Sequence, residues 1–227
     1  MPKNHLKIEC SPKTWPINRK VNTFTTRPNP GGSNRDMSIP INIILRNLLG
    51  KAKTTKEAKR ILHVQEILVN GTRRKDYRYP VAFMDVLSIP IEDEHYLMLI
   101  NKKNKLYLST IDKKESETKL SKITSKKLLG KDKVQLGTLD GRTAIVKKDT
   151  FKTGDTVVFS FSKKQEIKNH LKLEKGAKVL LFKGSHVGTF ATITEISGST
   201  IKVEYDKKEY ETKKDYAFVV GDLVKTK

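Results

Sequence analysis

Apolar and polar residues alternate most clearly between residues 40 and 89, where the pattern predicts two helices followed by a hairpin and a strand. Apolar residues first recur at intervals of three and four, the spacing of one helix face, at Ile41, Ile44, Leu45 and Leu48. This helix should end at Gly50, because glycine commonly follows the last helical residue. A second helix should begin after Thr54, which has the spacing of a capping box with Glu57.

The second helix should be amphipathic, with Ala58, Ile61 and Leu62 on its buried face. Its outer face carries cations about one turn apart, which suits contact with the phosphates of a nucleic acid: Lys53, Lys56, Lys59 and Arg60. Asn70-Gly71 then predicts a two-residue hairpin turn, because both of its residues tolerate positive φ. Two further candidate cations, Arg73 and Arg74, follow this turn directly.

Beyond Ile89 the pattern changes to short strands separated by turns, which is typical of small barrels and sandwiches. A hairpin is expected at 96–100 and 106–108, followed by a short helix or loop at 113–118. Further strands at 133–137, 143–146 and 155–161 indicate a central barrel or sandwich. A last set of strands is expected at 176–182, 189–196, 200–205 and 208–212. Their alternation predicts a second small barrel near the end of the chain.

The first forty residues have few aliphatic side chains and no helical or strand period. Such a segment cannot bury enough apolar surface by itself, so we expect it to be extended and to gain order on a partner. Its candidate contacts with RNA are the cations and the single tryptophan: Lys7, Lys13, Trp15, Arg19, Lys20 and Arg27. Trp15 has a second interpretation, in which it anchors the segment to the first domain.

The charge balance favours a polyanionic partner. The 227 residues include 46 Lys and Arg against 25 Asp and Glu, a formal net charge of +21. The excess is spread along the chain, at +5, +6, +8 and +2 over residues 1–40, 41–89, 90–172 and 173–227, which together give +21. Nucleic acid is the expected partner, in contact with much of the molecule. A single cysteine, Cys10, cannot form an internal disulfide, and a cytoplasmic location is expected.

Catalytic and metal-binding patterns are not found. The chain has no phosphate-binding Walker loop, dinucleotide fingerprint or nucleophile elbow, and its histidines have no metal-ligand spacing. Lys119-Leu120-Ser121-Lys122 echoes a loop of class I aminoacyl-tRNA synthetases, but the partner signature and the nucleotide-binding region are missing. Asp85 is interpreted as the cap of a turn before a strand. We therefore predict no enzymatic activity, no cofactor and no metal.

Several short motifs in the first domain resemble the S-four-type RNA-binding module. They are Leu45-Arg46, Ala52-Lys53-Thr54, Glu57-Ala58, Val69-Asn70-Gly71 and Asp85-Val86. The resemblance implies that the basic helix and the turn bind structured RNA through shape and phosphates, and it adds Arg46 and Lys51 to the candidate contacts. The alternative is a generic small α+β unit with a solvated basic face.

The segment from Gly176 to Ile196 resembles the KOW motif, a strand, glycine-rich turn and returning strand within a small SH3-like barrel. In that family the turn is a usual contact with RNA, which here implies Lys183, Ser185 and His186. His186 has a second interpretation, in which its imidazole bonds a neighbouring carbonyl.

Almost the whole chain resembles the archaeal and eukaryotic family of the fourth small-subunit ribosomal protein. The resemblance rests on the motifs already given together with His5-Leu6-Lys7, Pro12-Lys13-Thr14-Trp15, Arg27-Pro28 and the run from Tyr79 to Val86. Asn29-Pro30-Gly31-Gly32-Ser33 departs from the Gly-Pro-His that usually follows the Arg-Pro element. The resemblance implies small-subunit rRNA, in the 5′ domain of the body, and neighbouring ribosomal proteins as partners.

We therefore predict a multi-domain α+β protein with four parts: an extended basic segment (1–40), an S-four-type module (41–106), a central β domain (107–172) and a KOW-containing barrel (173–227). Its expected function is that of a structural, rRNA-binding constituent of the small ribosomal subunit, without a membrane or small-molecule partner. The alternative is a free regulatory translation or transcription-elongation factor with the same modules. An RNA-modifying enzyme would need a further catalytic domain.

Overall fold

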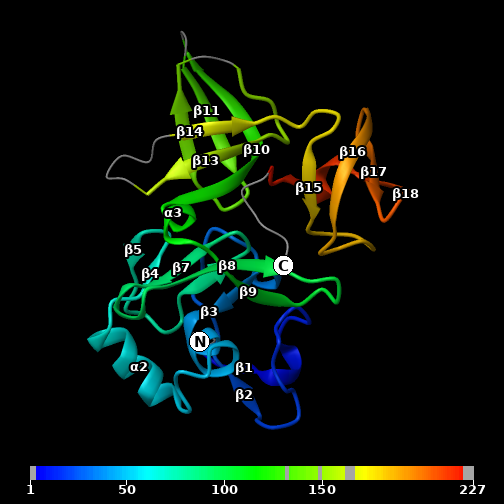
Figure 1. Ribbon diagram of the computed structural model, residues 1–227. Helices are drawn as coiled ribbons and strands as arrows, with labels where there is room; N and C mark the ends of the chain where they lie inside the picture. Colours follow the sequence, from blue (N-terminus) through cyan, green and yellow to red (C-terminus); the bar gives the residue numbers. More distant parts are fainter. Residues whose placement is uncertain (1–3, 131–132, 148–149, 162–166, 222–227) are drawn as a thin grey trace. The chain divides into compact units, whose positions relative to one another are not determined.

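The computed structural model describes residues 4–130, 133–147, 150–161 and 167–221, and it divides into two compact units (Figure 1). The first unit comprises the chain up to Ile100 together with Asn104–Glu117, and the second comprises Asn101–Lys103 and the chain from Thr118 onward. Strands predominate over short helices in both units, which confirms the predicted multi-domain α+β class. Within the described ranges, no helix is both long and apolar enough to cross a bilayer.

The two predicted helices of the first unit are present. Strand β3 (Ser38–Pro40) leads into α1 (Ile41–Ile43), which continues as the π-helical turn η3 (Ile44–Leu48), and α2 (Thr55–Val64) follows. The Thr54 hydroxyl accepts a hydrogen bond from the Glu57 backbone amide, and the Glu57 carboxylate accepts one from the Thr54 amide. This confirms the predicted capping box, which fixes where α2 begins.

A five-stranded sheet with the order β5-β4-β7-β8-β9 packs in the same unit. Its strands are β4 (Leu68–Val69), β5 (Thr72–Arg73), β7 (Val86–Ile89), β8 (Glu94–Ile100) and β9 (Leu106–Thr110). Strand β6 (Pro80–Ala82) pairs with β3 in a separate sheet, and the short helices η4 (Pro90–Glu92) and α3 (Lys113–Ser116) complete the unit. The first unit ends at Glu117, later than the predicted boundary at residue 106, because β9 pairs with β8.

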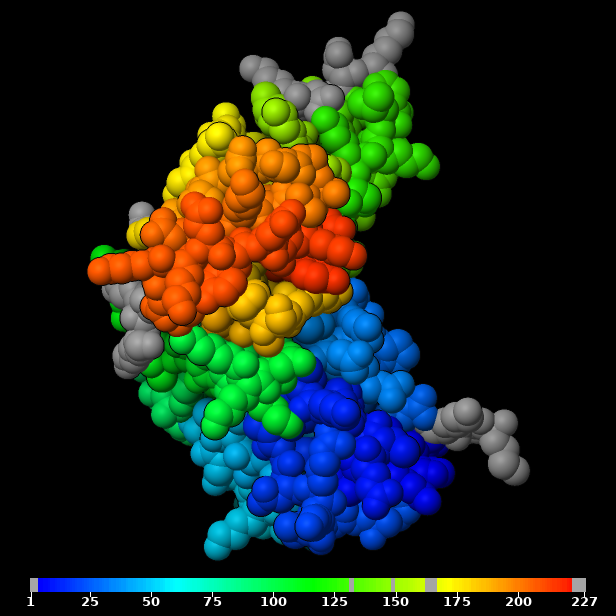
Figure 2. All heavy atoms as spheres, turned by 90° about the vertical axis from the view of Figure 1, so that its right-hand side faces the viewer, coloured from blue at the N-terminus to red at the C-terminus, as the bar shows by residue number. Residues whose placement is uncertain are grey.

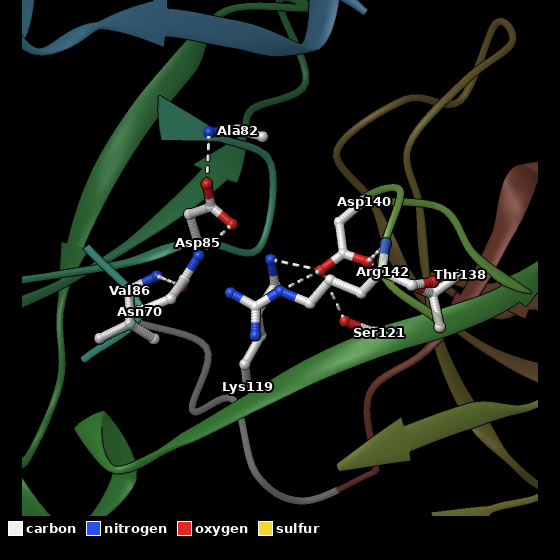
Figure 3. Close-up of polar contacts among 9 residues, drawn as sticks. All are labelled: Asn70, Ala82, Asp85, Val86, Lys119, Ser121, Thr138, Asp140 and Arg142. Carbon is white, nitrogen blue, oxygen red and sulfur yellow. Dashed lines mark hydrogen bonds and ion pairs between the residues drawn. The ribbon is translucent and has the colours of Figure 1, made fainter. Parts of the chain in front are cut away.

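A buried amide–carboxylate pair joins the predicted hairpin turn to the start of β7 (Figure 3). Asn70 and Gly71 have φ values of 52° and 72°, as the predicted turn requires. The Asn70 side-chain amide donates to Asp85 Oδ1 at 2.9 Å, and Asp85 Oδ2 accepts from the Ala82 backbone amide at 2.8 Å. Asp85 therefore caps a turn, as predicted, and it is 4% exposed.

The first forty residues belong to the first unit and pack into its core without a partner chain, so the expectation that they gain order only on a partner is wrong. Their elements are β1 (Leu6–Lys7), η1 (Ile8–Cys10), β2 (Phe24–Thr25) and η2 (Arg35–Met37), and β1 pairs with β2. The Trp15 ring is fully buried, and its Nε1–H donates to the Ser38 carbonyl at 2.7 Å. The neighbouring core supplies the apolar surface that the segment lacks by itself, which sequence composition could not indicate.

In the second unit, a five-stranded sheet with the order β12-β11-β10-β13-β14 forms the central β domain. Its strands are β10 (Thr118–Gly130), β11 (Lys133–Thr138), β12 (Thr143–Val146), β13 (Thr156–Ser160) and β14 (Ile167–Leu171). Their core side chains are Ile123, Val134, Leu136, Val157 and Phe159. The sequence pattern predicted three of these strands and missed β10 and β14.

The segment that echoes a synthetase loop lies in β10, and its two lysines are buried in intramolecular contacts. Lys119 Nζ lies 2.6 Å from Asp140 Oδ2, with side-chain exposures of 2% and 10% (Figure 3). Lys122 Nζ donates to the carbonyls of Lys214, Asp215 and Ala217 at 3.1, 2.9 and 2.7 Å. Burial lowers the Lys122 pKa to about 8. Both lysines therefore make their polar contacts within the second unit.

The C-terminal strands form a second five-stranded sheet, with the order β18-β17-β16-β15-β19. Its elements are β15 (Lys178–Leu181), β16 (Phe190–Ser197), β17 (Thr200–Tyr205), β18 (Lys208–Lys213), η5 (Lys214–Tyr216) and β19 (Ala217–Val219). The four predicted strands are present, whereas β19 was not predicted. At Gly188, between β15 and β16, a Cβ atom would lie 2.2 Å from the Asn101 carbonyl carbon, so the turn requires glycine there.

Candidate nucleic-acid interface

The outer face of α2 carries the cations that the sequence predicted there. Lys56, Lys59 and Arg60 are exposed, while Ala58 and Leu62 are buried beneath them. The capping box sets this orientation, since it fixes the first turn of the helix. Three positive side chains therefore share one solvent-facing surface.

Two tyrosine rings contact cations in and beside this helix. Lys59 Nζ lies 4.4 Å from the centroid of the Tyr77 ring, and Arg78 Cζ lies 5.4 Å from the same centroid. Arg78 Nε also donates to the Tyr77 hydroxyl at 3.0 Å. Arg74 Cζ lies 4.3 Å from the Tyr79 ring centroid. Contact with a ring restrains a cation without neutralising its charge, so these side chains keep their charge for an external anion.

The hairpin contributes one more cation to this region. Arg73 is exposed, and its Nη2 donates to the His63 carbonyl near the end of α2 at 3.2 Å. We call the resulting set the basic surface: Lys56, Lys59, Arg60, Arg73, Arg74 and Arg78. Among the residues that the structure describes, no carboxylate forms an ion pair with a member of this set.

Sequence reasoning missed Tyr77, Arg78 and Tyr79 as parts of this region. The signal was present, because Tyr77-Arg78-Tyr79 alternates aromatic and cationic residues shortly after Arg73 and Arg74. The fold is needed to interpret it, since the Tyr77 ring contacts Lys59 of α2 only when the loop packs beside that helix.

Three other candidates in this module have different roles. Lys53 is exposed, but its backbone amide donates to the Glu57 carboxylate at 2.8 Å, so it supports the start of α2. Arg46 Nε donates to the Lys53 carbonyl at 3.2 Å. Lys51 forms ion pairs with Glu92 and Glu94.

The carboxylates of Glu92 and Glu94 neutralise the Lys51 charge within the chain. Burial alone would lower the Lys51 pKa, but hydrogen bonds and charge attraction from Glu92 and Glu94 raise it above the ordinary value of 10.5. The hydrogen bond from Lys51 in turn lowers the Glu94 pKa. The basic surface therefore leaves Lys51 out.

Among the candidates of the first forty residues, some side chains are exposed and others form hydrogen bonds within the chain. Lys7, Lys13 and Lys20 are exposed, and Arg27 is half-buried. The Arg19 guanidinium donates to the carbonyls of Glu9, Ser11 and Pro12, and it thereby closes the loop around it.

The predicted RNA contact of Trp15 is wrong. The ring is enclosed by the protein on all sides, with no exposed area on which a base could stack. The anchoring interpretation is confirmed by this burial and by the hydrogen bond to Ser38.

The turn between β15 and β16 presents the three candidates of the last domain. Lys183 and Ser185 are exposed, and the His186 ring centroid lies 4.3 Å from that of Tyr210. The His186 carbonyl accepts a hydrogen bond from the Thr189 hydroxyl at 2.7 Å, which stabilises the turn. In the described part of the chain, no group of three or more His, Cys, Asp or Glu could hold a metal ion.

Comparisons with known proteins match different parts of the chain to the same family. Models of the RS4NT domain, the S4 domain and the ribosomal family S4e match residues 1–32, 40–87 and 92–166. The small ribosomal subunit proteins eS4 of Methanococcus maripaludis and Methanocaldococcus jannaschii are both 37% identical to the chain, covering 97% of it and 95% of each relative. The crystal structure of the 30S ribosomal protein S4e from Thermoplasma acidophilum matches with 32% identity and a TM-score of 0.71, covering 82% of this chain and 96% of that one.

Proposed function

This chain belongs to the ribosomal family S4e, and we propose that it is a structural constituent of the small ribosomal subunit that binds folded rRNA through its basic surface. The family consists of structural ribosomal proteins, so the chain is not an enzyme. One observation supports this binding mode above all. Lys59, Arg74 and Arg78 each contact a tyrosine ring, and none of them has a carboxylate partner among the described residues.

The geometry of these cations favours the RNA backbone over the bases. Lys59 and Arg78 both contact the Tyr77 ring, and Arg74 contacts the Tyr79 ring. Rings engaged by cations of their own chain are poor platforms for a stacked base, while the cations remain suited to phosphates. Recognition through phosphates and shape is typical of proteins that bind structured RNA.

Further contacts extend this function along the chain. The proposal includes Lys7, Lys13 and Lys20 of the N-terminal segment and the turn containing Lys183, all of which are exposed. Several contacts on one polyanion increase avidity beyond that of each surface alone. We place the binding region in the 5′ domain of the subunit body and the assembled particle in the cytoplasm, following the family resemblance and the single cysteine.

Changing Lys56, Lys59 and Arg60 together to alanine is expected to weaken binding to purified small-subunit rRNA. If each side chain neutralises one phosphate, the slope of log K against log salt should become shallower by roughly three, about one for each phosphate that is no longer neutralised. Filter binding over a series of salt concentrations measures this slope.

A charge-matched control separates local contacts from overall charge. Lys168, Lys172 and Lys175 are exposed in the second unit, and Lys172 lies 3.8 Å from the Glu174 carboxylate. Changing these three to alanine should alter the slope much less. Equal effects from the two triple variants would show that net charge alone, without the basic surface, governs binding.

A further inference from the structure

The outer half of β10 pairs with β11, which pairs in turn with β12, and the end of the β10–β11 pair extends past the rest of the central sheet (Figure 1). The inner half of β10, from Thr118 to Lys122, pairs with β13. From Ser125 onward β10 pairs with β11 alone, up to Gly130 opposite Lys133. We call Ser125–Gly130 together with Lys133–Leu136 the ribbon. Figure 2 shows its green atoms standing out at the upper right.

The ribbon exposes large apolar side chains. Leu128 and Leu129 are 69% and 46% exposed, and Ile145 on the adjoining strand β12 is 66% exposed. Leu128 pairs with Val134, and the pairing register shifts between Leu128 and Gly130, so Leu129 lies at an irregularity near the outer end of β10. Ile145 lies on the face of Lys127, since Ile145 pairs with Gln135 and Gln135 with Lys127. The outer ends of these strands therefore expose three large apolar side chains, a feature that marks an interaction site.

Cations accompany these apolar side chains. Lys127 and Lys133 are exposed on the ribbon, and Lys147 is exposed just after β12. Lysine is depleted in the apolar centres of protein–protein interfaces, whereas it is a regular contact of RNA phosphates. Apolar contact flanked by lysines therefore fits a nucleic acid better than a protein.

We propose that the ribbon is a further RNA-binding surface, which lies in the wide, shallow groove of an rRNA helix. In this position Leu128 and Leu129 contact the sugar faces, and Lys127 and Lys133 contact the phosphates at the groove edges. The inference rests on the proposed rRNA-binding function and adds a contact on the second unit. Two surfaces on one chain then hold separate parts of the RNA together.

The variant Leu128→Ser with Leu129→Ser tests this surface in the full chain. Both side chains are largely exposed, so folding should be retained, which thermal unfolding verifies. Hydroxyl-radical footprinting on purified small-subunit rRNA should show that one protected segment disappears, with binding about ten-fold weaker. Ile91→Ser, at a residue that is 65% exposed in the first unit, is the control and should leave the footprint unchanged.

The outcomes distinguish the ribbon from the basic surface. The Lys56, Lys59 and Arg60 variant should lose a different protected segment. If only that variant changes the footprint, the ribbon proposal fails and the proposed function stands; if neither variant does, both fail.

A photocrosslinking residue at Leu129, in the chain assembled into small subunits, identifies the partner directly. Crosslinks to rRNA are expected. Crosslinks to a neighbouring protein, without any to RNA, would overturn the RNA assignment.

Discussion

Replacing Trp15 with alanine is expected to lower the free energy of unfolding of the first unit by about 3–5 kcal/mol, the usual cost of deleting a buried aromatic ring. The ring is fully buried, and its removal also leaves the Ser38 carbonyl without its hydrogen-bond donor. Urea denaturation followed by far-UV circular dichroism measures the destabilisation. The effect arises from an anchor that fixes the N-terminal segment onto the neighbouring core.

The exposed Phe24 is the matched control for this variant. Its side chain is 56% exposed, so Phe24→Ala should change the free energy of unfolding by less than about 1 kcal/mol. Unchanged stability of the Trp15→Ala variant together with weakened RNA binding would contradict the anchoring role, because it would indicate a ring available for stacking.

Replacing Asp140 with alanine is expected to destabilise the second unit by about 3–5 kcal/mol, because the buried Lys119 ammonium loses its counter-charge. Asp140 also accepts hydrogen bonds from the hydroxyls of Ser121, at 3.1 Å, and Thr138. These donors lose their acceptor in the variant as well. Thermal and urea unfolding of the full chain measure the effect.

Two comparisons test the cause of this destabilisation. Replacing Glu195, whose pair with Lys202 is about half exposed, should cost no more than about 1 kcal/mol. Replacing both Lys119 and Asp140 by apolar residues of similar size should recover most of the stability, since no unpaired charge then remains buried. A double variant as unstable as Asp140→Ala would contradict the ion-pair explanation.

The stability difference between the native chain and Asp140→Ala should also depend on pH. Burial raises the Asp140 pKa, but the Lys119 charge and the hydrogen bonds from Lys119 and Thr138 outweigh it and hold the pKa below the ordinary value of 3.8. A carboxyl with a lowered pKa stabilises the fold fully above its unfolded-state pKa. The contribution is lost as the pH falls through the folded-state pKa, so the two proteins should converge in acid.

Local signals in the sequence predicted the first unit well. The capping box of Thr54 and Glu57 and the turn at Asn70-Gly71 depend on neighbouring residues only, and both are present. The exposed cations of α2 followed from the same helical period.

Features that depend on distant partners could not be predicted in this way. Strand β10 contains Lys119 and Lys122, which read as surface residues until Asp140 and the carbonyls near η5 are placed beside them. Trp15 was ambiguous for the same reason, since composition alone does not reveal the core that receives it.

The candidate RNA-binding lysines illustrate the same limit. Lys51 and Lys59 look alike in the sequence, yet Lys51 is satisfied by Glu92 and Glu94, while Lys59 is held by a tyrosine ring and keeps its charge. Which cations are available to an external polyanion depends on their neighbours in the fold, and these neighbours are not evident from the local sequence.

The folded chain is expected to remain bound to small-subunit rRNA through several cationic surfaces at once. Sedimentation of small ribosomal subunits through a sucrose gradient in high salt tests it most directly. Simultaneous contacts predict that the chain continues to migrate with the subunit peak. Release of the chain into the top fractions, with the subunits intact, would contradict a structural role and favour a factor that cycles on and off.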